Sequence, residues 1–297
     1  MTHGRNRIEP CRRAFLWSNP HPKSQDRVCW EHVPVLRAIA LPTGSLRVSA
    51  RAEMGFSQEA PVLSLVVPTY NEAENIEPFL QRIRGLLDPV LGSRYEVIVV
   101  DDNSPDETWR VAARIQGGYP QLVVLRREEE RGLSSAVVRG WQVAGGEILA
   151  TINADFQHPP ELLPKMLELV RAADLVAATR LGATGSFGEM PWLRRLLSRG
   201  ARRAGQFLVP QIFNRVSDPL SGYYLFRREA IAGIELRPTG FKTLIEVLAR
   251  GRVDTIEECP YAMQERRRGT SNVRWRDLVE YLKQLNRLRA DAGARPF

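Results

Sequence analysis

The feature that most constrains the fold is a regular alternation of short apolar runs and amphipathic segments that begins at Ala60. Each apolar run has the length of a strand, and the segment after it repeats apolar residues at helical spacing. The expected strands are Val62–Val67, Tyr95–Val100, Leu122–Leu125, Ile148–Ile152 and Leu175–Ala178, and the expected helices are Asn75–Leu87, Glu107–Gln116, Ser134–Ala144 and Pro160–Arg171. Buried strands separated by helices predict an α/β fold with a mainly parallel, doubly wound sheet.

Polar residues follow these strands where a parallel sheet binds its ligands, at the carboxyl ends of the strands. The residues at this edge are Tyr70, Glu72, Asp101, Asp102, Asn153 and Asp155. Carboxylates gathered at one edge are unfavourable unless a cation or several hydrogen-bond donors meet them. Mg²⁺ or Mn²⁺ bound together with a nucleotide would satisfy them.

Two segments at this edge have a structural alternative. The segment Asp101–Asp106 consists of residues that suit turns and helix N-caps, so a strand that turns into a helix explains it equally well. Farther along, a proline-initiated helix start explains Pro160 and Glu161 but not Asp155 together with Gln157. Because alternate side chains leaving a strand point the same way, Asp155 and Gln157 are favoured as ligands of one ion.

The charge of the chain predicts anionic partners. The net charge is +8, with 42 Lys and Arg against 34 Asp and Glu. Residues 180–228 carry a net +7, residues 263–290 a net +5 and residues 1–59 a net +4, so the remaining segments are acidic. This distribution predicts a metal or sugar site beside a phosphate or membrane surface, although a solvated helix face is the alternative for any one basic stretch.

Composition and spacing disfavour several other classes of protein. Three cysteines are too few for a disulfide framework, which favours a reducing, cytoplasmic setting. No run approaches the roughly 18 apolar residues of a membrane-spanning helix, and no export signal is recognisable. A nucleic-acid-binding protein is the non-enzyme alternative, but no nucleic-acid-binding motif accompanies the basic stretches. A dinucleotide-dependent dehydrogenase is disfavoured because no G-x-G-x-x-G follows the first strand.

The first 59 residues show no sustained strand or helix period and contain five prolines. We expect a poorly ordered extension, and Met54 is an alternative start of translation. The residues Cys11, His21, Cys29 and His32 lack the paired spacing of zinc sites, so no metal is assigned to them.

Six motifs occur in the order found in a known family. They are Pro68–Glu72, Val100–Asp106, Gly132–Ala136, Ala154–Glu161, Ser217–Arg228 and Glu265–Ser271. Together they resemble the inverting family-two glycosyltransferases of the dolichol-phosphate mannosyltransferase type, from about residue 62 to residue 285. The resemblance implies a GT-A fold, expected over residues 60–274. It also implies transfer of a hexose, mannose or glucose, from a nucleotide diphosphate sugar to a polyprenyl or dolichyl monophosphate. A glycan or diacylglycerol acceptor is the closest alternative.

The resemblance also implies residues on the donor side of the site. Pro68, Tyr70 and Glu72 would line the nucleotide, and Asp101 would hold the base with Asp102 nearby. Asp155 and Gln157 would ligate the Mg²⁺ or Mn²⁺ that bridges the diphosphate, and Asn153 stands where the family has Asp. Because asparagine keeps a coordinating oxygen but lacks the charge, we expect weaker metal binding.

On the acceptor side, the resemblance implies three groups of residues. The residues that approach the acceptor phosphate are Arg180, Arg194, Arg195, Ser198 and Arg199. The residues of the following loop are Asp218, Ser221 and Gly222, and Arg227 comes after this loop. The residues of a terminal motif that binds phosphate are Arg266, Gly269 and Ser271, and Asn272 replaces the family's Lys there. Catalysis is expected to rest on placement and charge neutralisation by Asp155, Arg180, Arg199, Asp218 and Arg266.

Residues 275–297 predict an amphipathic, basic helix with a tail. Such a helix suits the interface of an anionic bilayer or a small membrane-protein partner. Packing on the core is the equally weighted alternative. The expected location is the cytoplasmic face of a membrane, with peripheral attachment and no nucleic-acid partner.

Overall fold

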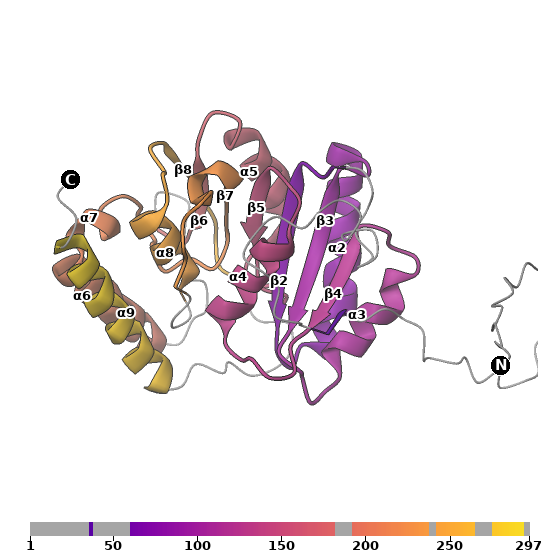
Figure 1. Cartoon of the computed structure of the whole chain (residues 1–297), viewed down its shortest axis with the longest axis horizontal. Coiled ribbons are helices and arrows are strands. Elements are labelled where there is room, and N and C mark those ends of the chain that lie inside the picture. The colour runs from indigo at the N-terminus through magenta and orange to yellow at the C-terminus, as the bar shows by residue number, and fades with distance from the viewer. Residues whose placement is uncertain (1–35, 38–59, 182–191, 238–241, 265–274, 294–297) are drawn as a thin grey trace, which may run out of the picture. The chain divides into compact units, whose positions relative to one another are not determined.

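The computed structural model describes residues 36–37, 60–181, 192–237, 242–264 and 275–293 (Figure 1). Its strands are β1 (Leu36–Arg37), β2 (Leu63–Thr69), β3 (Tyr95–Asp101), β4 (Leu122–Arg126), β5 (Ile148–Thr151), β6 (Leu175–Thr179), β7 (Tyr224–Arg227) and β8 (Ile256–Pro260). Its helices are α2 (Ala73–Leu91), α3 (Thr108–Gln116), α4 (Leu133–Val143), η2 (Pro160–Leu162), α5 (Leu163–Leu169), α6 (Trp192–Leu208), α7 (Pro210–Phe213), η3 (Arg228–Ile231), α8 (Thr243–Arg250) and α9 (Trp275–Gly293). All five expected strands and four expected helices are present, with small shifts at their ends.

The described strands form one eight-stranded mixed sheet in the order β1-β4-β3-β2-β5-β7-β6-β8. Every strand runs in the same direction except β7, which is antiparallel to both β5 and β6. The carboxyl ends of β2, β3, β5 and β6 therefore lie at one edge of the sheet (Figure 1). The start of β7 lies at the same edge, because Tyr224 is paired with Thr151 at the end of β5.

Alternate side chains of the central strands build two separate cores. Leu65 and Val67 of β2 pack on the face covered by α2, α3 and α5. Val66, between them, packs on the opposite face with α4, α8 and α9. Because both faces are covered, the central parallel strands are mostly apolar, which is the signal that makes them recognisable in the sequence.

The C-terminal helix α9 packs on the rest of the protein. Its Tyr281, Leu285 and Leu288 are buried in the core shared with α4 and α8. The hydroxyl of Tyr281 donates to the carbonyl of Ala201 in α6 at 2.7 Å. The buried carboxylate of Glu246 in α8 accepts from Arg287 at 2.5 Å. The described part of the helix thus follows the core-packed alternative. None of the described helices is long and apolar enough to span a bilayer.

Strand β1 lies within the segment expected to be a poorly ordered extension. Leu36 and Arg37 pair in parallel with Leu125 and Arg126 of β4. A two-residue strand carries no periodic signal, so the sequence gives no indication of this pairing.

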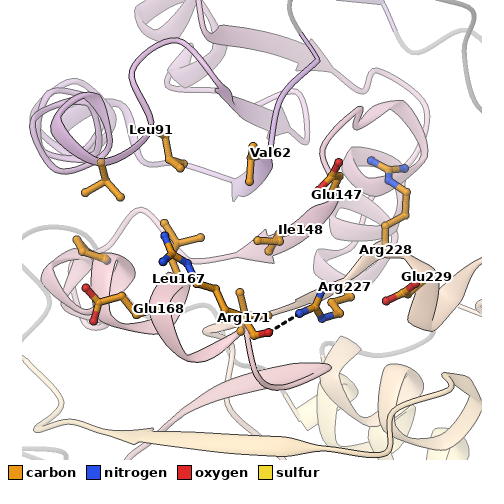
Figure 2. A pocket seen from close by; sticks show the side chains of 13 residues that line it. Val62, Leu91, Glu147, Ile148, Leu167, Glu168, Arg171, Arg227, Arg228 and Glu229 are labelled. Carbon is orange, nitrogen blue, oxygen red and sulfur yellow. Dashed lines mark hydrogen bonds between the residues drawn. The ribbon is translucent and has the colours of Figure 1, made fainter.

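A cavity of about 540 Å³ lies at the opposite, amino-terminal edge of the sheet (Figure 2). It is lined by the starts of β2 and β5 at Val62 and Ile148, and by Arg227 at the end of β7. The polar strand ends singled out by the sequence lie at the other edge, so this cavity is separate from them.

Candidate active site

Backbone strain gathers at the carboxyl edge of the sheet. Four described residues other than glycine have a positive φ, and all lie in the turns after β2, β3 and β5: Asn71, Asn103, Glu107 and Phe156. Asparagine adopts this conformation readily, whereas glutamate and phenylalanine do so at a cost of order 1–3 kcal/mol. Such strain persists where the surrounding structure fixes a functional geometry.

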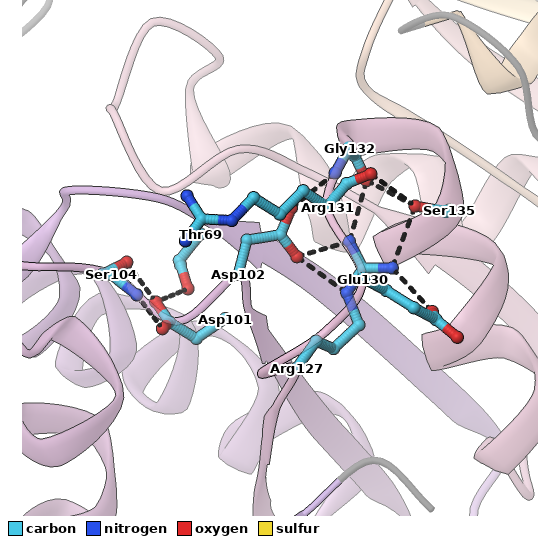
Figure 3. A network of polar contacts seen from close by, with 9 residues as sticks. All are labelled: Thr69, Asp101, Asp102, Ser104, Arg127, Glu130, Arg131, Gly132 and Ser135. Carbon is cyan, nitrogen blue, oxygen red and sulfur yellow. Dashed lines mark hydrogen bonds and ion pairs between the residues drawn. The ribbon is translucent and has the colours of Figure 1, made fainter. Parts of the chain in front are cut away.

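Asp101 organises the turn that follows β3 (Figure 3). Its carboxylate accepts hydrogen bonds from Thr69 Oγ1 at 2.9 Å and from the Ser104 amide and hydroxyl at 2.8 and 2.6 Å. Burial raises the pKa of Asp101, and these donors oppose that shift. Asp101 thus has the structural role that the sequence analysis gave as an alternative, in a strand that turns into a helix. Its role as the residue that holds the base stays a prediction.

Asp102 is held by a buried arginine that the sequence did not single out. Arg127, which is fully buried, donates to Asp102 Oδ1 through Nε at 2.7 Å and also through Nη2. The other Asp102 oxygen accepts from the Gly132 amide at 2.7 Å, and Arg127 Nη2 donates to the Gly132 carbonyl at 2.9 Å (Figure 3). The pair thus fastens the N-terminus of α4 to the end of β3. The only sequence signal is an arginine placed directly after an apolar strand.

The residues expected around the nucleotide lie beside these networks. Pro68 is buried within β2, and Tyr70, the first residue after this strand, is half-buried. The Arg131 guanidinium lies 5.9 Å from the centre of the Tyr70 ring. Glu72 precedes α2, and its carboxylate accepts from Asn75 Nδ2 at 2.6 Å. Polar side chains and the aromatic ring of Tyr70 thus form one wall of the candidate site, at the ends of β2 and β3.

The segment after β5 fixes Asp155 in a strained turn. Asp155 is buried, and its Oδ1 accepts from the Gln157 amide at 3.1 Å. Phe156, between the two, has a φ of 60°. Its ring is buried against Phe79 of α2, edge to face, at a centroid distance of 5.4 Å. The apolar contact holds the strained turn, so the positions of Asp155 and Gln157 are set by packing.

The donor set at this turn is compatible with a divalent ion that is also bound by phosphate. It offers one carboxylate, Asp155, and the amide oxygens of the half-buried Asn153 and Gln157. Within the described ranges, no cluster of three or more His, Cys, Asp or Glu side chains could hold a metal by itself. Mg²⁺ and Mn²⁺ prefer oxygen ligands and commonly take several from a substrate's phosphates. These residues therefore fit an ion that arrives with a diphosphate.

Arg180 and Asp218 form a buried ion pair next to this turn. Arg180 follows β6, and its Nε and Nη2 donate to the two carboxylate oxygens of Asp218 at 2.7 and 2.9 Å. Although burial opposes it, the guanidinium holds the pKa of Asp218 below its usual range. The structure thus brings together two residues that the sequence assigned separately to the acceptor side.

Three further residues complete this cluster, and the sequence analysis missed them as members of the site. His158 and Tyr261 are buried, and the Tyr261 hydroxyl lies 2.6 Å from His158 Nδ1. Lys242 donates to the carbonyl of Leu220, in the Asp218–Gly222 loop, at 2.5 Å. Burial and the neighbouring Arg180 lower the pKa of Lys242 to about 8. Each comes from a different segment, so no local motif joins them.

Arg227 is not part of this site, which corrects the expectation for it. It pairs with Ile148 at the start of β5, so it lies at the amino-terminal edge of the sheet. Its guanidinium donates to the carbonyl of Arg171 at 2.7 Å (Figure 2). It also donates to the carbonyl of Ala173 at 3.2 Å. The four residues of β7 carry the chain from one edge to the other, which separates Arg227 from Asp218 and Gly222.

The remaining expected residues are placed as follows. Ser221 is buried, and Gly222 is half-buried beside Asn153 and His158. Arg199 is exposed on α6. The side chains of Arg194, Arg195 and Ser198, together with Arg266, Gly269 and Ser271, lie outside the described residues.

Comparisons with known proteins show the family to which this chain is related. The sequence profile described as "Glycosyl transferase family 2" matches residues 64–234. A dolichol-phosphate mannosyltransferase of Pyrococcus furiosus is 40% identical over 76% of this chain, and the alignment spans 63% of that relative's length. The dolichol-phosphate mannosyltransferase of Saccharomyces cerevisiae is 33% identical over 76% of this chain and 86% of its own length.

A solved structure supports the fold. The glucosyl-3-phosphoglycerate synthase of Mycobacterium tuberculosis, crystallised with Mn²⁺ and UDP-glucose, superposes with a TM-score of 0.59 at 20% identity. The alignment covers 89% of this chain and 88% of that one. This likeness, together with the mixed sheet, confirms the expected GT-A α/β fold.

Proposed function

Because the chain belongs to glycosyl transferase family 2, we propose that it transfers a hexose from a nucleotide diphosphate sugar to a polyprenyl monophosphate, with inversion at the anomeric carbon. The observation that carries this proposal is the convergence of Asp155, Arg180 and Asp218 at one sheet edge, beside the strand ends that carry Tyr70 and Asp102. The named relatives act as dolichol-phosphate mannosyltransferases, which favours mannose as the sugar.

The donor would bind at the ends of β2, β3 and β5. Tyr70 offers an aromatic face for the nucleoside, and the fixed carboxylates of Asp101 and Asp102 set the shape of this wall. Asp155, Gln157 and Asn153 would hold the Mg²⁺ or Mn²⁺ that comes with the diphosphate. When bound, the ion supplies charge stabilisation to the departing diphosphate.

The acceptor would bind on the other side of Asp155. A lipid phosphate oxygen is already ionised near neutral pH, so the transfer requires placement more than a strong base. The phosphate oxygen forms a bond to the anomeric carbon as the bond from that carbon to the nucleotide diphosphate breaks. Arg180 and Lys242 place two positive charges against the single carboxylate of Asp218, and this excess favours an anionic acceptor.

Helix α6 offers the protein a way to reach a membrane-bound acceptor. Leu196, Arg199, Arg203 and Phe207 recur at helical spacing on one face, and all four are exposed. Phe207 is 82% exposed, which is unusual for a phenylalanine. An apolar residue at each end with cations between them suits the interface of an anionic bilayer. We therefore assign peripheral membrane attachment to α6 in place of α9.

The experiment that tests the function uses the purified full chain with Mg²⁺ or Mn²⁺, either GDP-mannose or UDP-glucose, and a short polyprenyl phosphate. Mass spectrometry of the lipid fraction should show a product heavier by one hexose. A matched reaction uses a diacylglycerol and an oligosaccharide as acceptors. Hexose on either of these, with none on the polyprenyl phosphate, would replace the proposed acceptor.

A further inference from the structure

The two ring nitrogens of His158 have different surroundings. The residue is 6% exposed, and its Nδ1 lies 2.6 Å from the Tyr261 hydroxyl. Within the described residues, no hydrogen bond joins Nε2, and Nε2 is not a fully enclosed polar atom. Nε2 is therefore the ring nitrogen that a ligand can reach.

The Tyr261 hydroxyl determines which nitrogen carries the proton. Burial raises the pKa of Tyr261, so its hydroxyl keeps its proton. Within the described ranges, Nδ1 of His158 is the one acceptor in reach of that hydroxyl. Tyr261 therefore donates to Nδ1, and the imidazole proton is assigned to Nε2.

Nε2 faces a small space between the two halves of the site. A Cβ added at Gly222 would lie 3.5 Å from His158 Nε2 and 3.6 Å from Asn153 Nδ2. Both nitrogens thus border the space that a side chain at position 222 would fill. Asn153 belongs to the turn of Asp155, and Gly222 belongs to the loop of Asp218. This space therefore lies between the proposed diphosphate side and the proposed acceptor side.

The position of this donor indicates its ligand. The reacting sugar must lie between the diphosphate that leaves and the phosphate that attacks. The arginines and the ion match the phosphate oxygens, and the hydroxyl oxygens of the sugar can accept a hydrogen bond from a ring N–H between them. Resting on the proposed function, we infer that His158 Nε2–H donates a hydrogen bond to a hydroxyl of the transferred sugar, and that Tyr261 is the positioning residue that keeps this proton in place.

Amide substitutions separate this role from a structural one. The amide nitrogen of glutamine occupies the place of Nε2, and that of asparagine the place of Nδ1. We expect H158Q to keep the affinity for the sugar, whereas H158N and H158L weaken it. Y261F removes the hydroxyl that fixes the tautomer of His158, so it should weaken the affinity for the sugar by less than H158L does.

The measurement is calorimetric binding to the full chain with Mn²⁺, using GDP-mannose against GDP and UDP-glucose against UDP. We expect H158L and H158N to lower the preference for nucleotide sugar over nucleotide by about 10-fold, since one hydrogen bond is lost. Binding of GDP and UDP should be unchanged, and melting temperatures identify any variant that fails to fold. An unchanged preference in folded H158L and H158N overturns the inference.

A steric probe gives an independent test. G222A adds a methyl group to the space in front of Nε2 at a position without a strained φ, so it should lower sugar affinity and leave the melting temperature unchanged. G85A, on the exposed face of α2 with no atom within 4 Å of the added methyl, is the matched control and should bind as the wild type does. Equal sugar affinity in G222A and G85A counts against the inference.

These outcomes are distinguishable from failure of the proposed function. If the wild type binds a nucleotide sugar but glycosylates no polyprenyl phosphate, the proposed acceptor is wrong and the affinity ratios still decide the role of His158. If the wild type transfers hexose and H158L does so with an unchanged ratio, the function stands and the inference fails. If the wild type binds neither nucleotide sugar, both are overturned.

Discussion

The guanidinium of Arg180 and the carboxylate of Asp218 bind each other through two hydrogen bonds, although 38 positions of sequence separate them. The pair joins the end of β6 to the loop that precedes β7, and both side chains are almost completely buried. A buried ion pair of this kind contributes little net stability but is costly to break from one side. It therefore allows the structural and functional parts of its role to be measured separately.

We expect R180M to lower the free energy of unfolding by about 3 kcal/mol, because it leaves the Asp218 carboxylate buried without its partner. The double variant R180M/D218L should recover most of this loss, since two apolar side chains replace the pair. Transfer should be lost in both variants. Denaturant unfolding and the lipid-product assay measure the two effects. Recovery of transfer together with stability in the double variant would limit the pair to a structural role.

The isosteric variant D155N should fold like the wild type, because its amide oxygen can still accept from the Gln157 amide. Its rate of transfer should fall by at least about 100-fold, since the proposed ion would lose its one carboxylate ligand. D106N is the matched control: it changes an aspartate at the same edge whose oxygens bind Thr108 and the Ala73 amide. Substantial turnover by D155N would remove the metal from the reaction.

N153D should strengthen metal binding, because it restores a negative charge beside Asp155. We expect the Mn²⁺ concentration for half-maximal transfer to fall by about 10-fold. N103D adds the same charge in the turn after β3, where Asn103 accepts from Arg126, and should leave the Mn²⁺ requirement unchanged. Equal Mn²⁺ requirements for the wild type and N153D contradict the assignment of Asn153.

Lys242 predicts a rise of stability with pH. In the folded chain its pKa is about 8, compared with an ordinary value of 10.5. Between these values the unfolded chain holds a proton that the folded chain has released, so the free energy of unfolding increases with pH, by at most about 1.4 kcal/mol per unit. The difference between wild type and K242M, from denaturant unfolding at pH 8, 9 and 10, should grow accordingly. If the difference in the free energy of unfolding does not change with pH, the lowered pKa of Lys242 in the folded chain is contradicted.

F207E should reduce binding to vesicles that contain phosphatidylserine, because it removes an apolar side chain of α6 that is 82% exposed. We expect a decrease of about 10-fold in the partition coefficient, measured by co-sedimentation, and an unchanged melting temperature. V90E replaces an exposed valine at the amino-terminal edge of the sheet and is the control. Equal loss in both variants would mean that α6 is not a specific contact.

Much of the fold could be predicted because its strands are buried on both faces. Tyr95–Asp101 and Leu122–Arg126 are mostly apolar, and each is followed by an amphipathic helix. Strand β8 was not predicted, since its Ile256–Pro260 carries Glu257 and Glu258 at the edge of the sheet. Strand β7 has only four residues, too few for a period to be read.

The site could be predicted in part for a similar reason. Asp101 and Asp102 lie at the end of one recognisable strand and Asp155 lies in the turn after another, so topology alone brings them to one edge. Arg127 and Lys242 belong to the site through burial and through partners far along the chain, which no local pattern encodes. Arg227 was assigned wrongly because sequence proximity to Asp218 does not show that a strand lies between them.

Because β7 runs in the reverse direction, the two sides of the candidate site are built in different ways. The proposed donor residues leave the ends of parallel strands, so their positions depend on the register of β2, β3 and β5. The Asp218–Gly222 loop instead arrives at the edge before its strand begins, anchored by Arg180 and Lys242. If this loop contacts the acceptor as proposed, insertions or exchanges in it would alter which acceptor is admitted while β2, β3 and β5 keep their register, so it is the segment to exchange in loop-grafting experiments.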